Sequence, residues 1–402
     1  MKRFLCLALA LLCLTLPVFG EEFSSVPEET ASRLEVLFRK YSTLGASVAL
    51  FENGRITYVY TYGTAWPGGD AITWDTGFQV GSISKMVSNI GLLQLMDREG
   101  IGLEDEWGDV LGFPVRHPQY PNTPVTFRQL MTHTASLRDS GDYDDAVLGK
   151  KKGVQELLTT RSAYTFYMDS EPGLKREYSN LGGGLIGVFI EKLSGQTLDE
   201  YMQQHVFEPL GILAAYHAST LGEQIPLADM YTMPEKYLAK SLRRDETTET
   251  EPDWTLCYTS TAGSLIISAP DLCKILIALC DGGVYENTRI LSASLVEEML
   301  TKQDYIGSVA CETGNGLFVN ILTDDQVEGR TLYGHGGKAY GMLCAAYFDP
   351  TDRTGVVMLT NGCDNSVMYR KVTGMLGREV CTLCYEELID PGHQTQDPFL
   401  MD

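Results

Sequence analysis

Strand-like patterns lie at the two ends of this sequence, and a mostly helical stretch separates them. Near the N-terminus, Val48–Phe51 and Arg55–Tyr60 are rich in β-branched and aromatic residues. They meet at Asn53-Gly54, a dipeptide that favours a tight hairpin turn. Four further strand-like runs come late in the chain: Gly316–Leu322, Thr331–Gly334, Met342–Phe348 and Gly355–Leu359. We therefore predict an α+β fold with one antiparallel sheet built from both termini, flanked by helices and carrying an inserted, mostly helical lobe.

The chain has 402 residues, of which 44% are hydrophobic, enough for one large domain with a substantial core. We place the α/β lobe at residues 21–82 and 255–390 and the helical lobe at 83–254, with a loose tail at 391–402. Three smaller elements are also expected. They are a short strand leading to Phe78, a solvated loop at Arg243–Trp254 and a closing helix at Tyr369–Leu388.

The first twenty residues have the pattern of an export signal. Lys2 and Arg3 provide the positive start, Phe4–Val18 is nearly all apolar, and Gly20 ends the segment as a small residue. The apolar run is short for a bilayer span, which needs about 20 residues. We predict a cleaved signal peptide at 1–20, an extracellular or cell-envelope location, and no membrane span in the mature chain.

The formal net charge of −22 argues against partners that need clustered Lys and Arg. Nucleic acids and anionic membrane surfaces belong to that class. We therefore expect small-molecule partners and no nucleic-acid partner; the sequence leaves the oligomeric state open.

Eight cysteines lie between Cys257 and Cys384, after the proposed signal. An exported protein can pair such cysteines, yet many of these stand in apolar periodic stretches where a thiol is simply a small buried side chain. Cys381 and Cys384 form a C-x-x-C pattern without a second ligand pair, so we expect neither zinc nor another cofactor there. Disulfide pairing remains open.

A helical pattern begins at Ser82 in the stretch VGSISKMVSN and ends at Gly100. Lys85 stands three residues after Ser82, so the two side chains share one face of the helix. A serine hydroxyl needs a base within hydrogen-bond reach to act as a nucleophile, and a lysine can provide one. A helix-capping serine with a solvated lysine is the alternative interpretation, because S-x-x-K alone is a common pattern.

Two further motifs favour the catalytic interpretation. REYSNLGGGLIG contains Tyr178 and Asn180, and LYGHGGKAYG places His335 and Gly337 at the end of a predicted edge strand. Together with Ser82 and Lys85 they resemble the S-x-x-K, Y-x-N and H-x-G motifs of the serine β-lactamase and penicillin-binding-protein superfamily. The branch with class C β-lactamases, DD-peptidases and related esterases is the most similar.

Other stretches resemble the same family in the same order. They are GASVALFENG, FQVGSISK, VTFRQLMTHTASL, VFEPLGI and AGSLIISAPDL, and the likeness covers roughly residues 33 to 388. VTFRQLMTHTASL departs from the family by reading Thr-Ala-Ser where Thr-Ser-Gly is usual, which puts the shape of that loop in question.

The resemblance implies a catalytic role for three residues. Ser82 would attack a carbonyl and become acylated, while Lys85 and Tyr178 would move the proton. Tyr178 would take it from Ser82 or deliver it to the leaving group.

The resemblance also implies substrate-binding roles. Asn180 would bind the substrate and steady Lys85, and His335 would face the polar end of the substrate. The backbone N–H groups of Ser82 and Lys338 would form the oxyanion hole, and Gly337 would let the substrate lie close to the strand.

Each of these residues also has a plain structural alternative. Tyr178 could be a packed aromatic, Asn180 a helix cap and His335 a turn residue. His133 could suggest a Ser-His-Asp triad, but the resemblance assigns its stretch to a structural loop. Ser82 also lacks the G-x-S-x-G surroundings of an α/β-hydrolase.

The reaction expected is acyl transfer from an ester, amide or lactam. Many relatives carry lysine where His335 stands, and the loss of that ammonium weakens binding of a drug's carboxylate. We therefore expect an exported serine hydrolase that acts on small esters or D-amino-acid peptides. β-Lactam hydrolysis is the first alternative, and a non-catalytic, penicillin-recognising binding module is the second.

Overall fold

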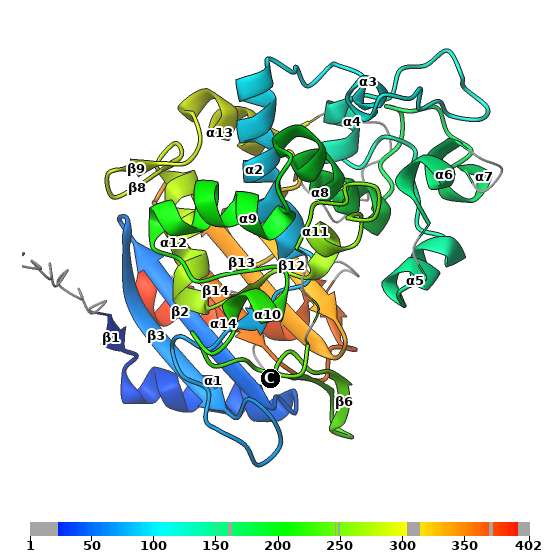
Figure 1. The fold of residues 1–402 in the computed structure, drawn as a ribbon. Coiled ribbons are helices and arrows are strands. Elements are labelled where there is room, and N and C mark those ends of the chain that lie inside the picture. The colour runs from blue at the N-terminus through cyan, green and yellow to red at the C-terminus, as the bar shows by residue number, and fades with distance from the viewer. Residues whose placement is uncertain are drawn as a thin grey trace, which may run out of the picture.

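A large sheet forms the centre of the computed structural model (Figure 1), which describes residues 23–150, 152–159, 163–245, 247, 250–303, 314–369 and 373–392. In the described residues the strand order is β1-β3-β2-β14-β13-β12-β11-β10. The strands are β1 (Ser24–Ser25), β2 (Gly45–Glu52), β3 (Arg55–Gly63), β10 (Gly314–Asn315), β11 (Asn320–Thr323), β12 (Thr331–Ala339), β13 (Met342–Asp349) and β14 (Thr354–Thr360).

The two ends of the chain meet where β2 pairs with β14. Every pairing in the sheet is antiparallel except that of β1, which runs parallel to β3. The predicted sheet built from both termini is confirmed, and so is the predicted hairpin. Asn53 and Gly54 both have positive φ, 50° and 79°, as a two-residue turn between twisted strands requires.

Helices cover both faces of this sheet. Helix α1 (Glu28–Lys40) and helix α14 (Met375–Cys384) pack on one face, and α12 (Ala269–Cys280) packs on the other. Alternate residues of β2 belong to the two separate apolar clusters, with Val48 and Leu50 in one and Ala49 and Phe51 in the other. Burial on both faces explains why this strand is apolar without alternation.

Helix α2 (Ile83–Glu99) joins the sheet to the helical lobe (Figure 1). Most of its residues are buried, and Gly100 ends it in the left-handed conformation predicted for a C-terminal glycine. The remaining helices are α3 (Trp107–Leu111), α4 (Phe127–Met131), α5 (Gly141–Val147), α6 (Val154–Thr159), α7 (Ala163–Phe166), α8 (Asn180–Ser194), α9 (Leu198–Met202), α10 (Ala218–Leu221), α11 (Ser260–Gly263) and α13 (Ala293–Leu300). Short π-helical or 3₁₀ segments occupy Gln203–Phe207, Glu208–Leu210 and Tyr385–Ile389.

Four small two-stranded sheets complete the described structure. They pair β4 (Phe78–Gln79) with β7 (Ile266–Ile267), β5 (Met230–Thr232) with β6 (Tyr237–Lys240), β8 (Val284–Tyr285) with β9 (Thr288–Arg289), and β15 (Met368–Tyr369) with β16 (Thr373–Gly374).

Several expected boundaries were wrong. The strand expected from Gly316 begins at Asn320, and the closing helix begins at Met375 rather than at Tyr369. The latter difference follows from the small sheet β15–β16, which uses the backbone just before the helix. The lobe boundaries at residues 82/83 and 254/255 stay a prediction.

The expected solvated loop begins with an anchored residue. The Arg243 guanidinium donates to the buried carboxylate of Asp229 at 2.6 Å and stacks 3.6 Å from the centre of the Trp66 ring. A buried carboxylate needs such a partner, which explains why the chain is held at this point.

Seven of the eight cysteines are described, and all of them except Cys280 are buried. Cys381 and Cys384 are buried within α14, consistent with their role as small core residues. Cys311 lies outside the described residues.

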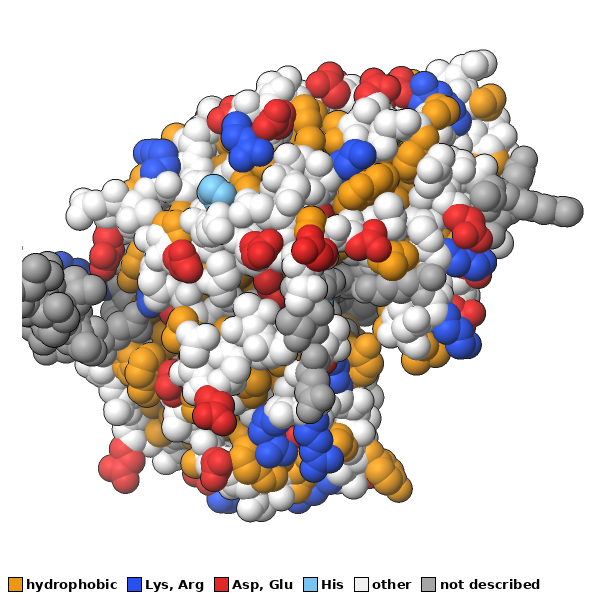
Figure 2. All heavy atoms as spheres, in the orientation of Figure 1, with side chains coloured by type: hydrophobic (Ala, Val, Ile, Leu, Met, Phe, Trp, Pro, Cys, Tyr) orange, Lys and Arg blue, Asp and Glu red, His pale blue; other side chains and the backbone are white. Residues whose placement is uncertain are grey.

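Charged side chains are spread over the face shown in Figure 2, with acidic ones at many separate points. A search of the described residues for a helix long and apolar enough to cross a membrane found none. The proposed signal at 1–20 and residues 393–402 of the proposed tail lie outside the described part of the chain.

Candidate active site

Ser82 stands at the turn between β4 and α2 and is partly exposed. Gly81 before it has a φ of 56°, and a Cβ there would meet the Met342 side chain at 2.7 Å and the Lys338 nitrogen at 3.2 Å. Only glycine allows this tight passage beside β12. The turn therefore presents the Ser82 hydroxyl next to the strand that carries the third motif.

Lys85 lies one helical turn beyond Ser82 and is fully buried. Its Nζ donates to Ser82 Oγ at 3.1 Å, to Asn180 Oδ1 at 3.0 Å and to the Ala262 carbonyl at 2.5 Å. These three acceptors match the three N–H donors of an ammonium group. The alternative of a solvated lysine is thereby excluded.

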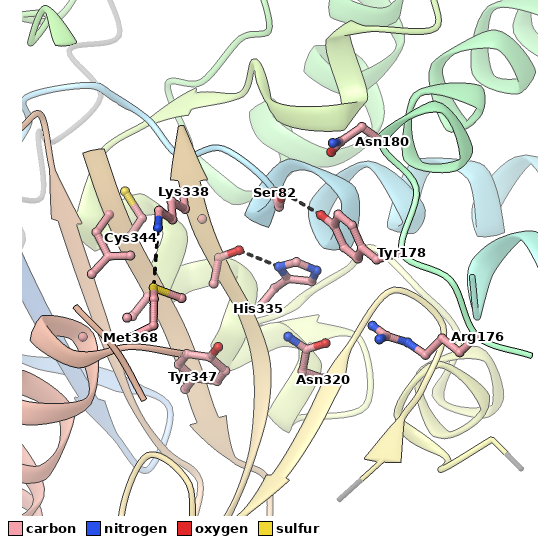
Figure 3. Close-up of a pocket in the computed structure, with 16 residues that line it drawn as sticks. Ser82, Arg176, Tyr178, Asn180, Asn320, His335, Lys338, Cys344, Tyr347 and Met368 are labelled. Carbon is pink, nitrogen blue, oxygen red and sulfur yellow. Dashed lines mark hydrogen bonds between the residues drawn. The ribbon is translucent and has the colours of Figure 1, made fainter. Parts of the chain in front are cut away.

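Tyr178 precedes α8 and points toward Ser82 (Figure 3). Its hydroxyl donates to Ser82 Oγ at 2.6 Å, and the Lys85 nitrogen lies 5.0 Å from the centre of its ring. The side chain is 37% exposed, so it is not a packed core aromatic. Two distant segments, one carrying Ser82 and Lys85 and the other carrying Tyr178, thus bring an alcohol, an amine and a phenol together.

Asn180 holds Lys85 with its amide oxygen and is itself oriented by Asp139. Asp139 accepts from Asn180 Nδ2 at 2.8 Å, from the Leu181 N–H at 2.9 Å and from Ser179 Oγ at 3.1 Å. Because the carboxylate takes the amide N–H, the amide oxygen must face Lys85. Sequence reasoning missed Asp139, which stands 41 residues from Asn180 and carries no local motif.

His133 does not contact Ser82; it holds the chain on both sides of Tyr178. Its carbonyl accepts from the Glu177 N–H at 2.8 Å, and its Nδ1 accepts from the Ser179 N–H at 3.3 Å. The centre of its ring lies 4.5 Å from the centre of the Tyr178 ring. This geometry agrees with the structural role expected for its loop.

The loop keeps its turn although serine replaces the usual glycine. Ser136 adopts a φ of 58°, a conformation that glycine takes more readily, and its hydroxyl donates to the Ser170 carbonyl at 2.6 Å. This hydrogen bond offsets part of the conformational cost.

The third motif lies inside β12 rather than at the end of an edge strand. Strand β11 pairs with β12 only as far as Gly334, while pairing with β13 continues to Ala339. From His335 onward, β12 is therefore no longer paired with β11. A Cβ on Gly337 would lie 2.0 Å from the Val80 carbonyl, so this part of β12 closely approaches the segment before Ser82.

His335 is buried, and its Nδ1–H donates to the Gly336 carbonyl at 2.6 Å. The pKa of His335 is lowered to about 3, mainly by burial and also by the positive charges of Lys85 and Arg176, while the hydrogen bond to Gly336 partly opposes this effect. The imidazole is therefore neutral at neutral pH. It faces Tyr178 with 6.4 Å between the ring centres.

The match to a family model decides the family. The model of the Beta-lactamase family matches residues 30–374. The chain belongs to the beta-lactamase family. Penicillin-binding protein 4 of Amycolatopsis lactamdurans is 29% identical over 342 residues, which are 82% of this chain and 84% of that protein.

Solved structures show that the fold is that of the β-lactamase and penicillin-binding-protein superfamily. EstCE1, described as a hydrolase with promiscuous acyltransferase activity, has a TM-score of 0.67 at 21% identity, covering 89% of this chain and 98% of its own. The D-amino acid amidase of Ochrobactrum anthropi SV3 has a TM-score of 0.64 at 22% identity, covering 83% and 90%. Neighbours of this kind, with the family match, indicate a serine hydrolase of the β-lactamase type.

The family's three motifs line a pocket of about 400 Å³ (Figure 3). Its wall includes Arg176 and Asn320, which sequence reasoning missed. Arg176 stands two residues before Tyr178, and this position next to the motif could have identified it as a candidate site residue. Among the described residues, no cluster of potential metal ligands was found.

Lys338 extends along the same pocket. Its ammonium lies 3.6 Å from Met368 Sδ, away from Ser82 (Figure 3). Its side chain is therefore not the counterpart of the missing lysine at position 335, and the role assigned to its backbone N–H stays a prediction.

Proposed function

We propose that this protein is an exported serine hydrolase that forms an acyl-enzyme on Ser82 and acts on small esters or D-amino-acid amides and peptides. The observation that carries the proposal is the hydrogen bonding around Ser82 Oγ, with Tyr178 at 2.6 Å and Lys85 at 3.1 Å. Both groups are within the distance that proton transfer requires.

Acylation would proceed in two steps. Ser82 Oγ forms a bond to the substrate's carbonyl carbon as its proton passes to the Tyr178–Lys85 pair, which then carries one proton more than before. Tyr178 next gives that proton to the leaving group as the bond between the carbonyl carbon and the leaving group breaks. The pair can take up this proton only in the form that has already lost one, in which the Ser82 hydroxyl donates to the Tyr178 oxygen and Lys85 stays an ammonium.

Deacylation would reverse the proton path. Water, or another acceptor hydroxyl, attacks the acyl carbon and yields its proton to the pair, and Ser82 Oγ recovers a proton as it leaves. The backbone N–H groups of Ser82 and Lys338 would bind the carbonyl oxygen in both halves, and one such donor typically contributes roughly 3 kcal/mol to the transition state.

Because His335 is neutral, it favours substrates whose group next to β12 is uncharged. A histidine with a pKa of about 3 offers no cation to a carboxylate at neutral pH. The amidase and hydrolase neighbours are consistent with amide and ester substrates.

β-Lactam or carboxypeptidase chemistry is the second candidate, because Arg176 lines the same pocket and carries a positive charge. A leaving group with a carboxylate would find that charge beside His335. His335→Lys should then raise nitrocefin turnover, and no rise would point to pocket shape as the limit.

The test of the proposal is a substrate panel with purified wild type and Ser82→Ala. The panel contains p-nitrophenyl butyrate, D-alanine p-nitroanilide, a D-Ala-D-Ala peptide and nitrocefin. We expect turnover of the ester or the D-amino-acid anilide, lost in Ser82→Ala at unchanged thermal stability. A folded protein that turns over none of them and only binds penicillin would favour the binding-module alternative.

Export is tested separately by the N-terminal sequence of the protein recovered from the culture medium or cell envelope. We expect it to start near residue 21. Recovery of the full chain from the cytoplasm would contradict export.

A further inference from the structure

A second pocket, of about 340 Å³, also has Ser82 in its wall. Ser82, Asn180 and Lys338 line both pockets, while Tyr178 and His335 line only the first. The residues that line only the second include Gln79, Asp144, Lys240 and Gly263. A substrate whose carbonyl carbon reaches Ser82 therefore extends into both.

The position of Tyr178 decides which half of the substrate enters which pocket. Tyr178 gives its proton to the leaving group in the proposed reaction, so the leaving group lies in the first pocket. The acyl half then lies in the second. This assignment rests on the proposed function.

Lys240 ends β6 and reaches into the second pocket. Its Nζ donates to Gln79 Oε1 at 3.0 Å, and the Gln79 amide nitrogen donates to the Gly263 carbonyl at 2.8 Å. The bond to Gly263 turns the amide oxygen toward Lys240. The ammonium is thus held in place by a neutral group three residues before the nucleophile.

The charge of Lys240 is incompletely compensated. Among the ion pairs of the described residues, none involves Lys240, although its side chain is only partly exposed. Burial lowers the pKa of Lys240, and the more distant Asp245 partly opposes this effect. Largely buried charges in proteins normally have a charged partner. The Lys240 ammonium is therefore suited to bind an anionic group of a ligand.

We infer that the second pocket is an acyl-group subsite in which Lys240 binds a carboxylate carried by the acyl chain of the substrate. Substrates of this class are monoesters or monoamides of dicarboxylic acids, with the scissile carbonyl at one end and the free carboxylate at the other. One acid, Asp144, also lines the pocket, but it is exposed on α5. The Lys338 ammonium is directed toward Met368 of the first pocket.

The experiment compares two esters of equal chain length, mono-p-nitrophenyl glutarate and p-nitrophenyl pentanoate. They differ only in a terminal carboxylate against a methyl group, and the rate without enzyme is subtracted from each. The quantity measured is the ratio of kcat/KM for the anionic ester to that for the neutral ester. Normalising to the neutral ester removes any general loss of active enzyme.

Three variants make the measurement specific. Lys240→Met removes the charge and keeps the length, and Lys240→Arg keeps the charge. Lys236→Met removes an exposed lysine from the turn of the same hairpin and serves as the control. We expect the ratio to fall roughly tenfold to a hundredfold in Lys240→Met, the range for one hydrogen bond to a charged group. Lys240→Arg should keep most of the wild-type ratio, and Lys236→Met should have the same ratio as wild type.

An equal ratio in wild type and Lys240→Met, with both esters turned over by Ser82, would overturn the subsite and leave the hydrolase intact. Loss of turnover for both esters in Lys240→Met, with Lys240→Arg equally inactive, would also overturn it, because Lys240 would then only tie β6 to Gln79. If wild type hydrolysed neither ester and Ser82 took no label, the proposed hydrolase itself would be wrong and the subsite with it.

Discussion

Two adjacent glycines in the first turn of α8 provide a test of the position of Lys85. A Cβ on Gly183 would lie 2.3 Å from Lys85 Cε and 2.6 Å from Cδ, whereas a Cβ on Gly182 would meet nothing closer than 3.7 Å. Gly183→Ala therefore pushes directly against Lys85. Gly182→Ala makes the same chemical change without a steric clash and is the matched control.

The size of the effect follows from these distances. Non-bonded carbon atoms settle at about 3.5–4.0 Å, so Lys85 must move by about 1.2 Å or more to accept the new methyl group. Its ammonium is held at 3.1 Å from Ser82 Oγ and 3.0 Å from Asn180 Oδ1, and such a shift breaks this geometry. A misplacement of about 1 Å in an active site can cost about a hundredfold in rate.

The assay is kcat/KM for p-nitrophenyl butyrate, with thermal unfolding measured on the same samples. Replacing glycine by alanine within a helix raises the free energy of unfolding by about 0.5–1 kcal/mol. We expect this gain in Gly182→Ala, whereas in Gly183→Ala the clash with Lys85 cancels it. We expect Gly182→Ala to retain wild-type kcat/KM and Gly183→Ala to lose about a hundredfold. A folded Gly183→Ala with wild-type kcat/KM would refute the reasoning that Lys85 must occupy this position.

Three further predictions concern the same site. Tyr178→Phe should lower kcat/KM by about a hundredfold to ten-thousandfold, the range for a general acid–base group. The thermal midpoint of this variant should stay near that of wild type because the Tyr178 side chain is 37% exposed. Full activity in Tyr178→Phe would contradict the proposed proton path. Lys85→Ala should block acylation, and rapid labelling by a fluorophosphonate in that variant would reveal another base. Burial lowers the pKa of His335 from 6.5 to about 3, so the unfolded chain binds the proton first and stability falls as the pH drops through this range. His335→Gln should make urea-unfolding stability less sensitive to pH between these values, and an unchanged slope would contradict the buried, neutral imidazole.

Patterns that depend on near neighbours in the chain could be predicted from the sequence. The Asn53-Gly54 hairpin and the helix ending at Gly100 are set by backbone preferences of one or two residues. The family motifs pointed to Ser82, Lys85 and Tyr178, and in the structure Lys85 and Tyr178 both donate a hydrogen bond to Ser82 Oγ.

Contacts between distant segments could not be predicted in this way. Asp139 orients Asn180 from another loop, and Lys240 meets Gln79 across 161 residues. A carboxylate or lysine of this kind has the same local sequence signal as a solvated one. The Asp229 carboxylate that holds Arg243 was missed for the same reason.

The end of the third motif's strand was also misplaced. Gly336 and Gly337 weaken the strand pattern, so the predicted strand stopped at Gly334, whereas pairing with β13 continues to Ala339. Glycine is needed at position 337 because the strand passes so close to the Val80 carbonyl there.

Covalent labelling of the native protein by a fluorophosphonate, followed by intact mass and peptide mapping, tests the nucleophile most directly. The geometry around Ser82 Oγ predicts one adduct per chain, located on Ser82 and absent from Ser82→Ala. An unlabelled, correctly folded wild type, or an adduct on a different residue that persists in Ser82→Ala, would contradict the proposed nucleophile.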